Sequence, residues 1–299
     1  MEDFSASRAI GAGFDLIRRE PLILLAWGAI YLLVGLLPQA AMASLMLPEF
    51  ARLSQQAAAG ASAATSAELM EAQGRMMQLQ PLSWLASIAC QALLLGAAYR
   101  AVLFPEDRRF FYLRLGAREL WMGLVMLVLF VMIFLLAFAI MLPTMLIAGF
   151  AAVLSGGASS MGLIAIPLVL AGWSVAIWVL LRLSLATPLS FAERGFKLFE
   201  SWDLTRGHAG KMFGVALALF AMVLGAELVL VTGAVILAGG FGGLFGWLQH
   251  PQTDLSRLAP AIAVGAVVIG LLGAAFFAIL GAAWGQIYRE LTLDPTEAF

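Results

Sequence analysis

The chain has 299 residues, of which 63% are hydrophobic and 12% charged, and its mean hydropathy is +0.97. Soluble domains average about 45–50% apolar and about 25% charged residues, so this composition excludes a soluble protein and is typical of a multi-pass membrane protein. The net charge of −1 offers no basic surplus for nucleic acid. The single cysteine, Cys90, excludes disulfide frameworks and thiolate metal sites.

Six apolar runs along the chain are long enough to cross a membrane, which takes about 20 residues. They cover approximately 21–47, 81–104, 120–142, 162–187, 213–238 and 260–290. The chain starts with the acidic MEDFSAS, so we interpret the first run as an uncleaved membrane helix and not as a signal peptide. Apolar tails follow at 143–154 and 239–248, and we expect kinked or interfacial pieces there, with Pro143 and the glycine-rich 239–246 as break points.

The basic residues predict the orientation of these spans. With a cytoplasmic N-terminus, most of the 17 Lys and Arg residues fall inside: Arg8, Arg18, Arg19, Arg100, Arg108, Arg109, Arg114, Arg118, Arg182, Arg194, Lys197, Arg206, Lys211 and Arg289. Only Arg52, Arg75 and Arg257 fall outside. By the positive-inside rule both termini are therefore expected in the cytoplasm. Abundant Ala, Gly and Arg with little Lys favour a bacterial protein, and hence the bacterial cytoplasmic (inner) membrane.

The cytoplasmic connections have the pattern of amphipathic interfacial helices. In 4–19 one face carries Ala6, Ile10, Gly13 and Ile17. Segment 189–202 repeats the pattern, with apolar residues at helical spacing opposite charged ones. Segment 106–119 opens with two acids after Pro105, which is typical of a helix start. We expect one interfacial helix in each segment.

A repeated element closes the even-numbered spans. Each ends in an arginine that precedes a proline by five or six positions: Arg100 and Pro105, Arg182 and Pro188, Arg289 and Pro295. We therefore predict an all-α polytopic fold in a single membrane domain, 1–299. It would contain three parallel repeats, 1–105, 106–188 and 189–299, each an interfacial helix followed by a transmembrane helical hairpin, related by a pseudo-axis along the membrane normal.

The three repeat arginines have three explanations. A long basic side chain near a helix end reaches the headgroups at little cost. Alternatively, the repeat gathers Arg100, Arg182 and Arg289 around one axis near the inner leaflet, where guanidiniums match lipid phosphates bidentately. A site for a transported anion is the third explanation. Arg206 and Lys211 are expected to contact lipid as well.

Glu227 is the one carboxyl deep inside a span, about 14 residues or about 21 Å from the cytoplasmic end of its run. An ionisable group at that depth is a candidate functional residue. It would act as a proton-relay acid, hydrogen-bond a polar side chain such as Thr232, Gln91 or Ser174, or face an aqueous cavity.

Small residues on two spans predict close helix packing, within the protomer in preference to a dimer interface. The two ladders are Gly270, Ala274, Ala278 and Ala282 on the sixth span, and Gly214, Ala218, Ala221 and Gly225 on the fifth.

Catalytic patterns are sparse. The segment TRGHAGKMF imitates the end of a phosphate loop, but Met212 stands where a hydroxyl is needed and no strand precedes it. The two histidines, His208 and His250, fall on opposite sides of the membrane, which excludes a paired-histidine metal site. We predict a non-enzymatic protein with no metal and no cofactor.

The exit RLSLATP, followed by SWDLTRGH, resembles a group of bacterial six-helix inner-membrane proteins. These are the membrane domain found with bacterial glycerophosphodiester phosphodiesterases and the YciC-like proteins. The matching positions are Arg182, Ser184, Pro188, Trp202, Thr205 and Gly207. The resemblance implies a cytoplasmic-membrane location and a lipid-related setting. It implies no catalysis, because no segment of this chain has the size of the catalytic TIM barrel.

Three hypotheses of function follow. The first is binding of anionic lipid or another amphiphile at the inner-leaflet face, through Arg100, Arg182 and Arg289. The second is a small proton-coupled transporter or channel that uses Glu227. The third is a membrane scaffold or assembly factor, with the loop 48–80 as the surface for a second copy or another membrane protein.

Overall fold

The computed structural model describes residues 4–44, 63–155, 159–237 and 255–292, and all regular structure in these ranges is helical. Six of the described helical segments are long and apolar enough to cross a membrane: Ile23–Ser44, Gln80–Leu103, Arg109–Leu154, Ala165–Glu193, Ala209–Gly233 and Ala263–Thr292. Each overlaps one predicted run, so the prediction of six spans is confirmed.

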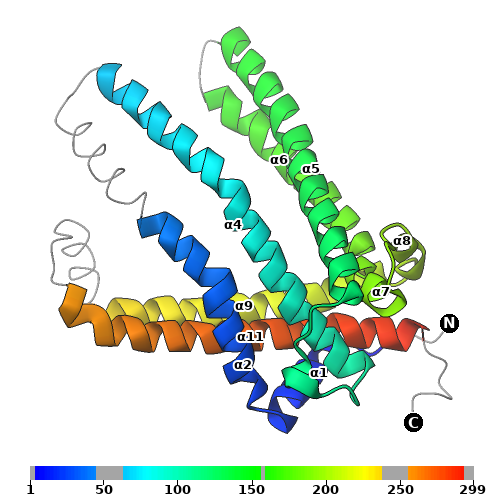
Figure 1. Cartoon of the computed structure of the whole chain (residues 1–299). Helices are drawn as coiled ribbons and strands as arrows, with labels where there is room; N and C mark the ends of the chain where they lie inside the picture. The colour runs from blue at the N-terminus through cyan, green and yellow to red at the C-terminus, as the bar shows by residue number, and fades with distance from the viewer. Residues whose placement is uncertain (1–3, 45–62, 156–158, 238–254, 293–299) are drawn as a thin grey trace.

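The long helices diverge from a common region beside α1 (Ala6–Arg19) and α7 (Ala186–Glu193), as Figure 1 shows. The first span is α2 (Ile23–Ile30), which continues into a π-helical stretch η1 (Tyr31–Leu36). The other long helices are α4 (Ala63–Leu103), α5 (Ala117–Ser155), α6 (Ser159–Leu183), α9 (Ala209–Leu237) and α11 (Leu255–Thr292). Two short elements complete the order: the 3-10 turn η2 (Arg109–Tyr112) and α8 (Glu200–Leu204).

Helix α4 lies at the centre of the bundle and contacts α11, α5, η1, η2 and α7. Every residue from Leu94 to Arg100 is buried. Small residues allow this, because a Cβ added to Gly281 of α11 would lie 2.4 Å from the Cβ of Ala98. Ala274, Ala278 and Ala282 of the α11 ladder are fully buried, so this ladder packs inside the protomer, as predicted.

The equivalent ladder on α9 is placed differently. A Cβ added to Gly214 or Gly225 would meet nothing within 4 Å, and Ala221 is exposed. Only the first third of α9 joins the core, through Met212, Val215 and Leu219. The predicted close packing of the α9 ladder within the protomer is therefore wrong for the residues that the structure describes.

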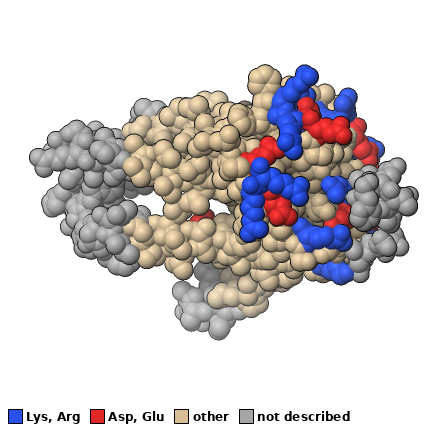
Figure 2. Space-filling model, turned by 90° about the horizontal axis from the view of Figure 1, so that it is seen from below, with Lys and Arg blue, Asp and Glu red and all other residues tan. Residues whose placement is uncertain are grey.

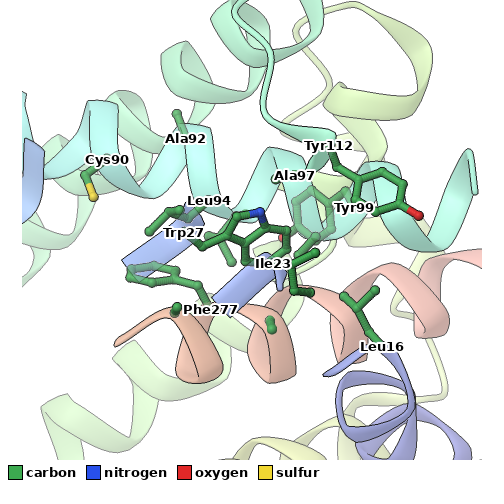
Figure 3. Close-up of a cluster of buried hydrophobic side chains, with 14 of the residues drawn as sticks. Leu16, Ile23, Trp27, Cys90, Ala92, Leu94, Ala97, Tyr99, Tyr112 and Phe277 are labelled. Atoms are coloured by element: carbon green, nitrogen blue, oxygen red, sulfur yellow. The ribbon is translucent and has the colours of Figure 1, made fainter. Parts of the chain in front are cut away.

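A buried cluster between α2, α4 and α11 surrounds Trp27, which is fully buried (Figure 3). Figure 3 places Leu94 of α4 and Phe277 of α11 beside the indole. The indole Nε1 donates a 2.9 Å hydrogen bond to the carbonyl of Phe111, so the polar atom of this side chain is satisfied.

Helix α1 forms where predicted, but it packs against protein. Its residues Ala9, Gly13 and Leu16 are buried, and α1 lies along α11. A Cβ on Gly13 would come within 2.3 Å of the Cα of Ile279, so the glycine permits this close approach.

The other two interfacial helices are corrected by the structure. Residues 106–116 form turns and not a helix, because Phe110, Phe111 and Tyr112 adopt left-handed backbone angles, with φ of 53°, 56° and 64°. Segment 189–202 is split into the end of α7 and the start of α8, because Arg194 is also left-handed, with φ of 56°.

The predicted break at Pro143 is also wrong, since α5 runs through it as one helix. A proline removes one backbone donor, and neighbouring helices and hydroxyl side chains offset this loss in membrane helices. Here α5 packs along α6. The other predicted break, 239–246, lies outside the described residues.

Candidate functional site

Charged side chains gather at one end of the molecule, as Figure 2 shows, whereas the rest of the described surface in that view is almost free of them. We call this region the charged end. It contains α1, the connection 104–116, α7, α8 and the last turns of α4, α6 and α11. The three repeat arginines, Arg100, Arg182 and Arg289, each lie in the last turn of their helix.

Arg100 forms a buried ion pair and is only 4% exposed. Its guanidinium contacts the carboxylate of Glu119, which is 3% exposed. Nη1 donates a 2.5 Å hydrogen bond to the carbonyl of Tyr112, and Nε lies 3.7 Å from Asp107. A buried charge needs such partners, because desolvation is costly otherwise. The geometry therefore makes Arg100 a structural residue whose donors are occupied.

The left-handed turn at Phe110 to Tyr112 supplies several of the contacts at this end. Its carbonyls accept from Arg100 and from the indole of Trp27. The Tyr112 hydroxyl donates a 2.9 Å hydrogen bond to Glu20, which follows α1. Left-handed backbone is unfavourable for residues with a Cβ, so these long-range contacts have to hold the turn in place.

Arg289 lines a pocket of about 530 Å³ between α1, α4 and α11, which we call the α1 groove. Its lining consists of Ser7, Arg8, Gly11, Ala12, Asp15, Leu16, Arg19, Glu20, Ala101, Val102, Pro105, Arg108, Tyr112, Gln286 and Arg289. The guanidinium of Arg289 donates a 3.5 Å hydrogen bond to the carbonyl of Val102. Within the described residues, no carboxylate lies in ion-pair distance of Arg289 or Arg19.

The α1 groove carries a positive surplus. Four arginines and two carboxylates line it. One carboxylate, Glu20, is already 3.3 Å from the Nε of Arg108 and accepts from Tyr112. Arg8 lies 3.5 Å from Glu290, whose carboxylate also accepts from the backbone amide of Ser5. Arg19 and Arg289 are thus the groove's available guanidiniums.

A second pocket, of about 630 Å³, lies beside the start of α5, and we call it the α5 pocket. It is lined by Arg100, Leu103, Phe104, Pro105, Glu106, Asp107, Arg114, Leu115, Gly116, Ala117, Arg118, Glu119 and Arg194. Asp107 accepts from Arg114 at 2.8 Å. The guanidinium of Arg118 lies 3.9 Å from the ring centroid of Phe104.

Arg182 lies apart from both pockets, between α6 and α8. Its guanidinium is 5.7 Å from the ring of Trp178 and 5.6 Å from that of Trp202. Its Nε and Nη1 are buried and have no hydrogen-bond partner in the part of the chain that the structure describes. The hydroxyls of Ser201 and Thr205 donate to the Arg182 carbonyl, at 2.9 and 3.2 Å. Part of the SWDLTRGH segment therefore has a structural role, since it caps the end of α6.

The remaining predicted residues are dispersed. Arg206 and Lys211 are exposed at the start of α9. Glu227 is exposed farther along α9, in a stretch where Leu228 and Val229 are 69% and 73% exposed. Neither of the two pockets described above is lined by Glu227.

The structure thus separates the three repeat arginines. Arg100 forms a buried ion pair, Arg289 lines the α1 groove, and Arg182 lies beside two tryptophan rings. The sequence did not indicate the residues that accompany Arg289, because Arg19 and Arg108 served only to predict the orientation of the spans. It also missed Arg118 and Arg194. The signal for these positions was the density of arginine in the cytoplasmic connections, which gives no information about which of them converge.

An exposed ion-pair network lies near the bend between α7 and α8. The Nζ of Lys197 is 3.1 Å from Glu200 and 3.5 Å from Glu193. These carboxylates raise the pKa of Lys197, chiefly through its hydrogen bond with Glu200. Such solvent-exposed pairs contribute little to stability, so Lys197 is a suitable site for a control substitution.

Together these features define the class of the molecule: a multi-pass α-helical membrane protein with a charged end and two basic pockets. Within the described residues, no group of three or more His, Cys, Asp or Glu side chains is placed to hold a metal ion. Comparison with protein-family models, with curated proteins and with solved structures finds no match for the chain.

Proposed function

We propose that the protein binds the headgroup of an anionic lipid or a similar amphiphile in the α1 groove, without catalysis. The observation that carries the proposal is Arg289, which lines a basic groove at the end of apolar helices and, among the described residues, has only a carbonyl as its partner. Arg19 lies in the same groove. Guanidiniums bind phosphate oxygens bidentately, so two of them suit a lipid phosphate.

The groove also offers surface to the apolar part of such a ligand. Leu16, Ala101 and Val102 line it beside the arginines. An amphiphile would place its phosphate against Arg19 and Arg289 and its first methylene groups against these side chains. Arg100 is not part of this proposal, because Glu119 occupies its guanidinium.

The proposal includes a location and an orientation. The charged end would face the cytoplasm, with both termini on that side, in the inner membrane of a bacterium. The excess of arginine at that end supports this orientation. The three parallel repeats 1–105, 106–188 and 189–299 also stay a proposal, supported by Arg100, Arg182 and Arg289 lying in the last turns of α4, α6 and α11.

Native mass spectrometry of the purified full chain tests the function. A basic residue near an anionic membrane surface contributes about 1 kcal/mol. The double variant Arg19→Gln with Arg289→Gln is therefore expected to lose about 2 kcal/mol, or about thirty-fold in affinity for phosphatidylglycerol. Lys197→Gln removes one exposed charge outside the groove and should keep the lipid. Equal lipid retention in the double variant and the wild type would refute the proposal.

A second candidate function, proton coupling through Glu227, rests on one observation. The carboxyl lies inside the span Ala209–Gly233 among apolar side chains, and an ionisable group inside a span is a candidate functional residue. In proteoliposomes, Glu227→Gln should abolish proton flux while the melting temperature stays unchanged. Proton flux equal to that of the wild type would exclude this function.

A further inference from the structure

We propose that the α5 pocket is a second anion site, in which Arg118 and Arg194 bind a phosphate group. The site shares no arginine with the α1 groove and does not depend on the function proposed above. Its ligand class is a phosphate ester, carried either by a small soluble molecule or by a lipid headgroup.

The charges of the pocket leave two guanidiniums without a counter-ion. Of the four lining arginines, Arg100 pairs with Glu119 and Arg114 pairs with Asp107. Arg118 and Arg194 have no carboxylate within ion-pair distance among the described residues. The third carboxylate of the lining, from Glu106, forms no such pair with them either. A bound anion would supply the missing negative charge.

Arg118 and Arg194 line the same pocket as the paired Arg100 and Arg114. The lining holds four arginines and three carboxylates, so it carries a surplus of positive charge. Like charges held together at a partly desolvated surface are unfavourable, and a phosphate between them would convert this repulsion into two attractions.

Arg118 is held in an orientation suited to a ligand. Its guanidinium lies over the ring of Phe104, 3.9 Å from the centroid, and 5.7 Å from the ring of Phe191. A guanidinium that contacts aromatic faces keeps its N–H groups at the edge, where they remain available as donors. Its side chain is therefore ordered before a ligand binds, which reduces the entropy that binding costs.

The backbone at Arg194 gives an independent indication. Arg194 is the C-cap of α7 in the left-handed region, with φ of 56°, where glycine is favoured and a residue with a Cβ is strained. A glycine would remove that strain. Contact between the arginine side chain and an anion in the pocket that it lines would offset this strain.

The dimensions and the lining fit a phosphate ester. The pocket of about 630 Å³ lies within the usual range for small-molecule sites, about 300–1,000 Å³. Leu103, Phe104 and Leu115 form an apolar wall beside the arginines. The wall would contact the organic part of the ester while Arg118 and Arg194 hold its phosphate.

Thermal unfolding of the full chain in detergent tests the proposal, with inorganic phosphate and glycerol 3-phosphate as probes against chloride at equal ionic strength. If the site accepts a soluble phosphate, these probes should raise the melting temperature of the wild type, since a ligand stabilises the state that it binds. Arg118→Gln and Arg194→Gly should each lower the affinity about tenfold or more. Lys197→Gln should respond as the wild type does.

The Arg194→Gly variant separates a binding role from a structural one. Without ligand it should melt at or above the wild-type temperature, because glycine relieves the left-handed strain. A lower melting temperature without ligand would indicate that Arg194 is structural and would overturn its assignment. Ligand shifts equal to the wild type in both variants would overturn the site.

The source of the phosphate is decided by a parallel arm in lipid nanodiscs. If phosphatidylglycerol stabilises the wild type through Arg118 and the soluble esters do not, the ligand is a lipid headgroup. If the soluble esters stabilise it in phosphatidylcholine nanodiscs, the ligand is a soluble molecule. No stabilisation by any of these probes refutes the proposal.

Discussion

The buried pair of Arg100 and Glu119 gives the sharpest test of how the charged end is held together. Glu119→Gln removes the charge that faces Arg100, and Arg100→Met removes the guanidinium itself. Both residues are less than 5% exposed, at 4% and 3%. Removing one partner of such a pair leaves an uncompensated buried charge, which costs about 3–5 kcal/mol.

The double variant Arg100→Met with Glu119→Leu distinguishes a structural pair from two independent contributions. Apolar residues of similar volume often replace a buried ion pair at little cost. Space at this point is limited, because a Cβ on Gly96 would already lie 3.2 Å from the Cγ of Glu119, so the replacing residues must not exceed the native side chains in volume. We therefore expect the double variant to lose less free energy of unfolding than either single variant does. Two independent contributions would instead add up.

Reversible unfolding in mixed detergent and sodium dodecyl sulfate micelles, followed by circular dichroism, measures these free energies. Arg206→Met is the matched control, because Arg206 is exposed, and its cost should be below about 0.5 kcal/mol. Single-variant costs below about 1 kcal/mol, or additive costs in the double variant, would refute the structural role of Arg100. In that case its original interpretation as a lipid ligand would regain support.

Three further predictions concern packing and topology. Gly13→Ala should destabilise the protein by about 1–3 kcal/mol, because its Cβ would lie 2.3 Å from the α11 backbone. The control Gly11→Ala should be neutral or stabilising, because nothing lies within 4 Å of its Cβ. Equal effects of the two variants in the same unfolding assay would contradict the packing of α1. Trp27→Phe should cost about 1 kcal/mol through loss of its 2.9 Å hydrogen bond, and a stability equal to the wild type would show that the bond contributes nothing. After replacement of the single native cysteine by alanine, Glu106→Cys should react with impermeant maleimide only in inside-out vesicles and Gln73→Cys only in right-side-out ones; the reverse pattern would invert the proposed orientation.

The spans could be predicted because each depends on local composition over about 20 residues. The same holds for the position of Arg100, Arg182 and Arg289, since an arginine at the end of an apolar run marks the last helical turns. Their surroundings could not be predicted in this way. Arg100 is neutralised by Glu119, 19 positions away, and only the packing of α4 against α5 brings the two side chains together.

The corrected elements share a physical cause: tertiary contacts decided the local conformation. Nothing in the sequence at Phe110 to Tyr112 favours left-handed backbone, because none of these residues is Gly, Asn or Asp. The turn is fixed by long-range hydrogen bonds to Trp27, Arg100 and Glu20. At Pro143 the tertiary contacts have the opposite effect on local structure. Packing of α5 along α6 maintains a helix through a residue that usually ends one.

The connection that follows α4 has one more consequence, because it forms a wall of both pockets. Arg108 and Tyr112 line the α1 groove, Phe104 and Asp107 line the α5 pocket, and Pro105 lines both. A ligand that shifts this wall from one side changes the shape offered to the ligand on the other side. Thermodynamic reciprocity then requires each ligand to alter the affinity of the other by the same factor. Measuring one binding isotherm at increasing occupancy of the second pocket would give the sign and size of that coupling directly.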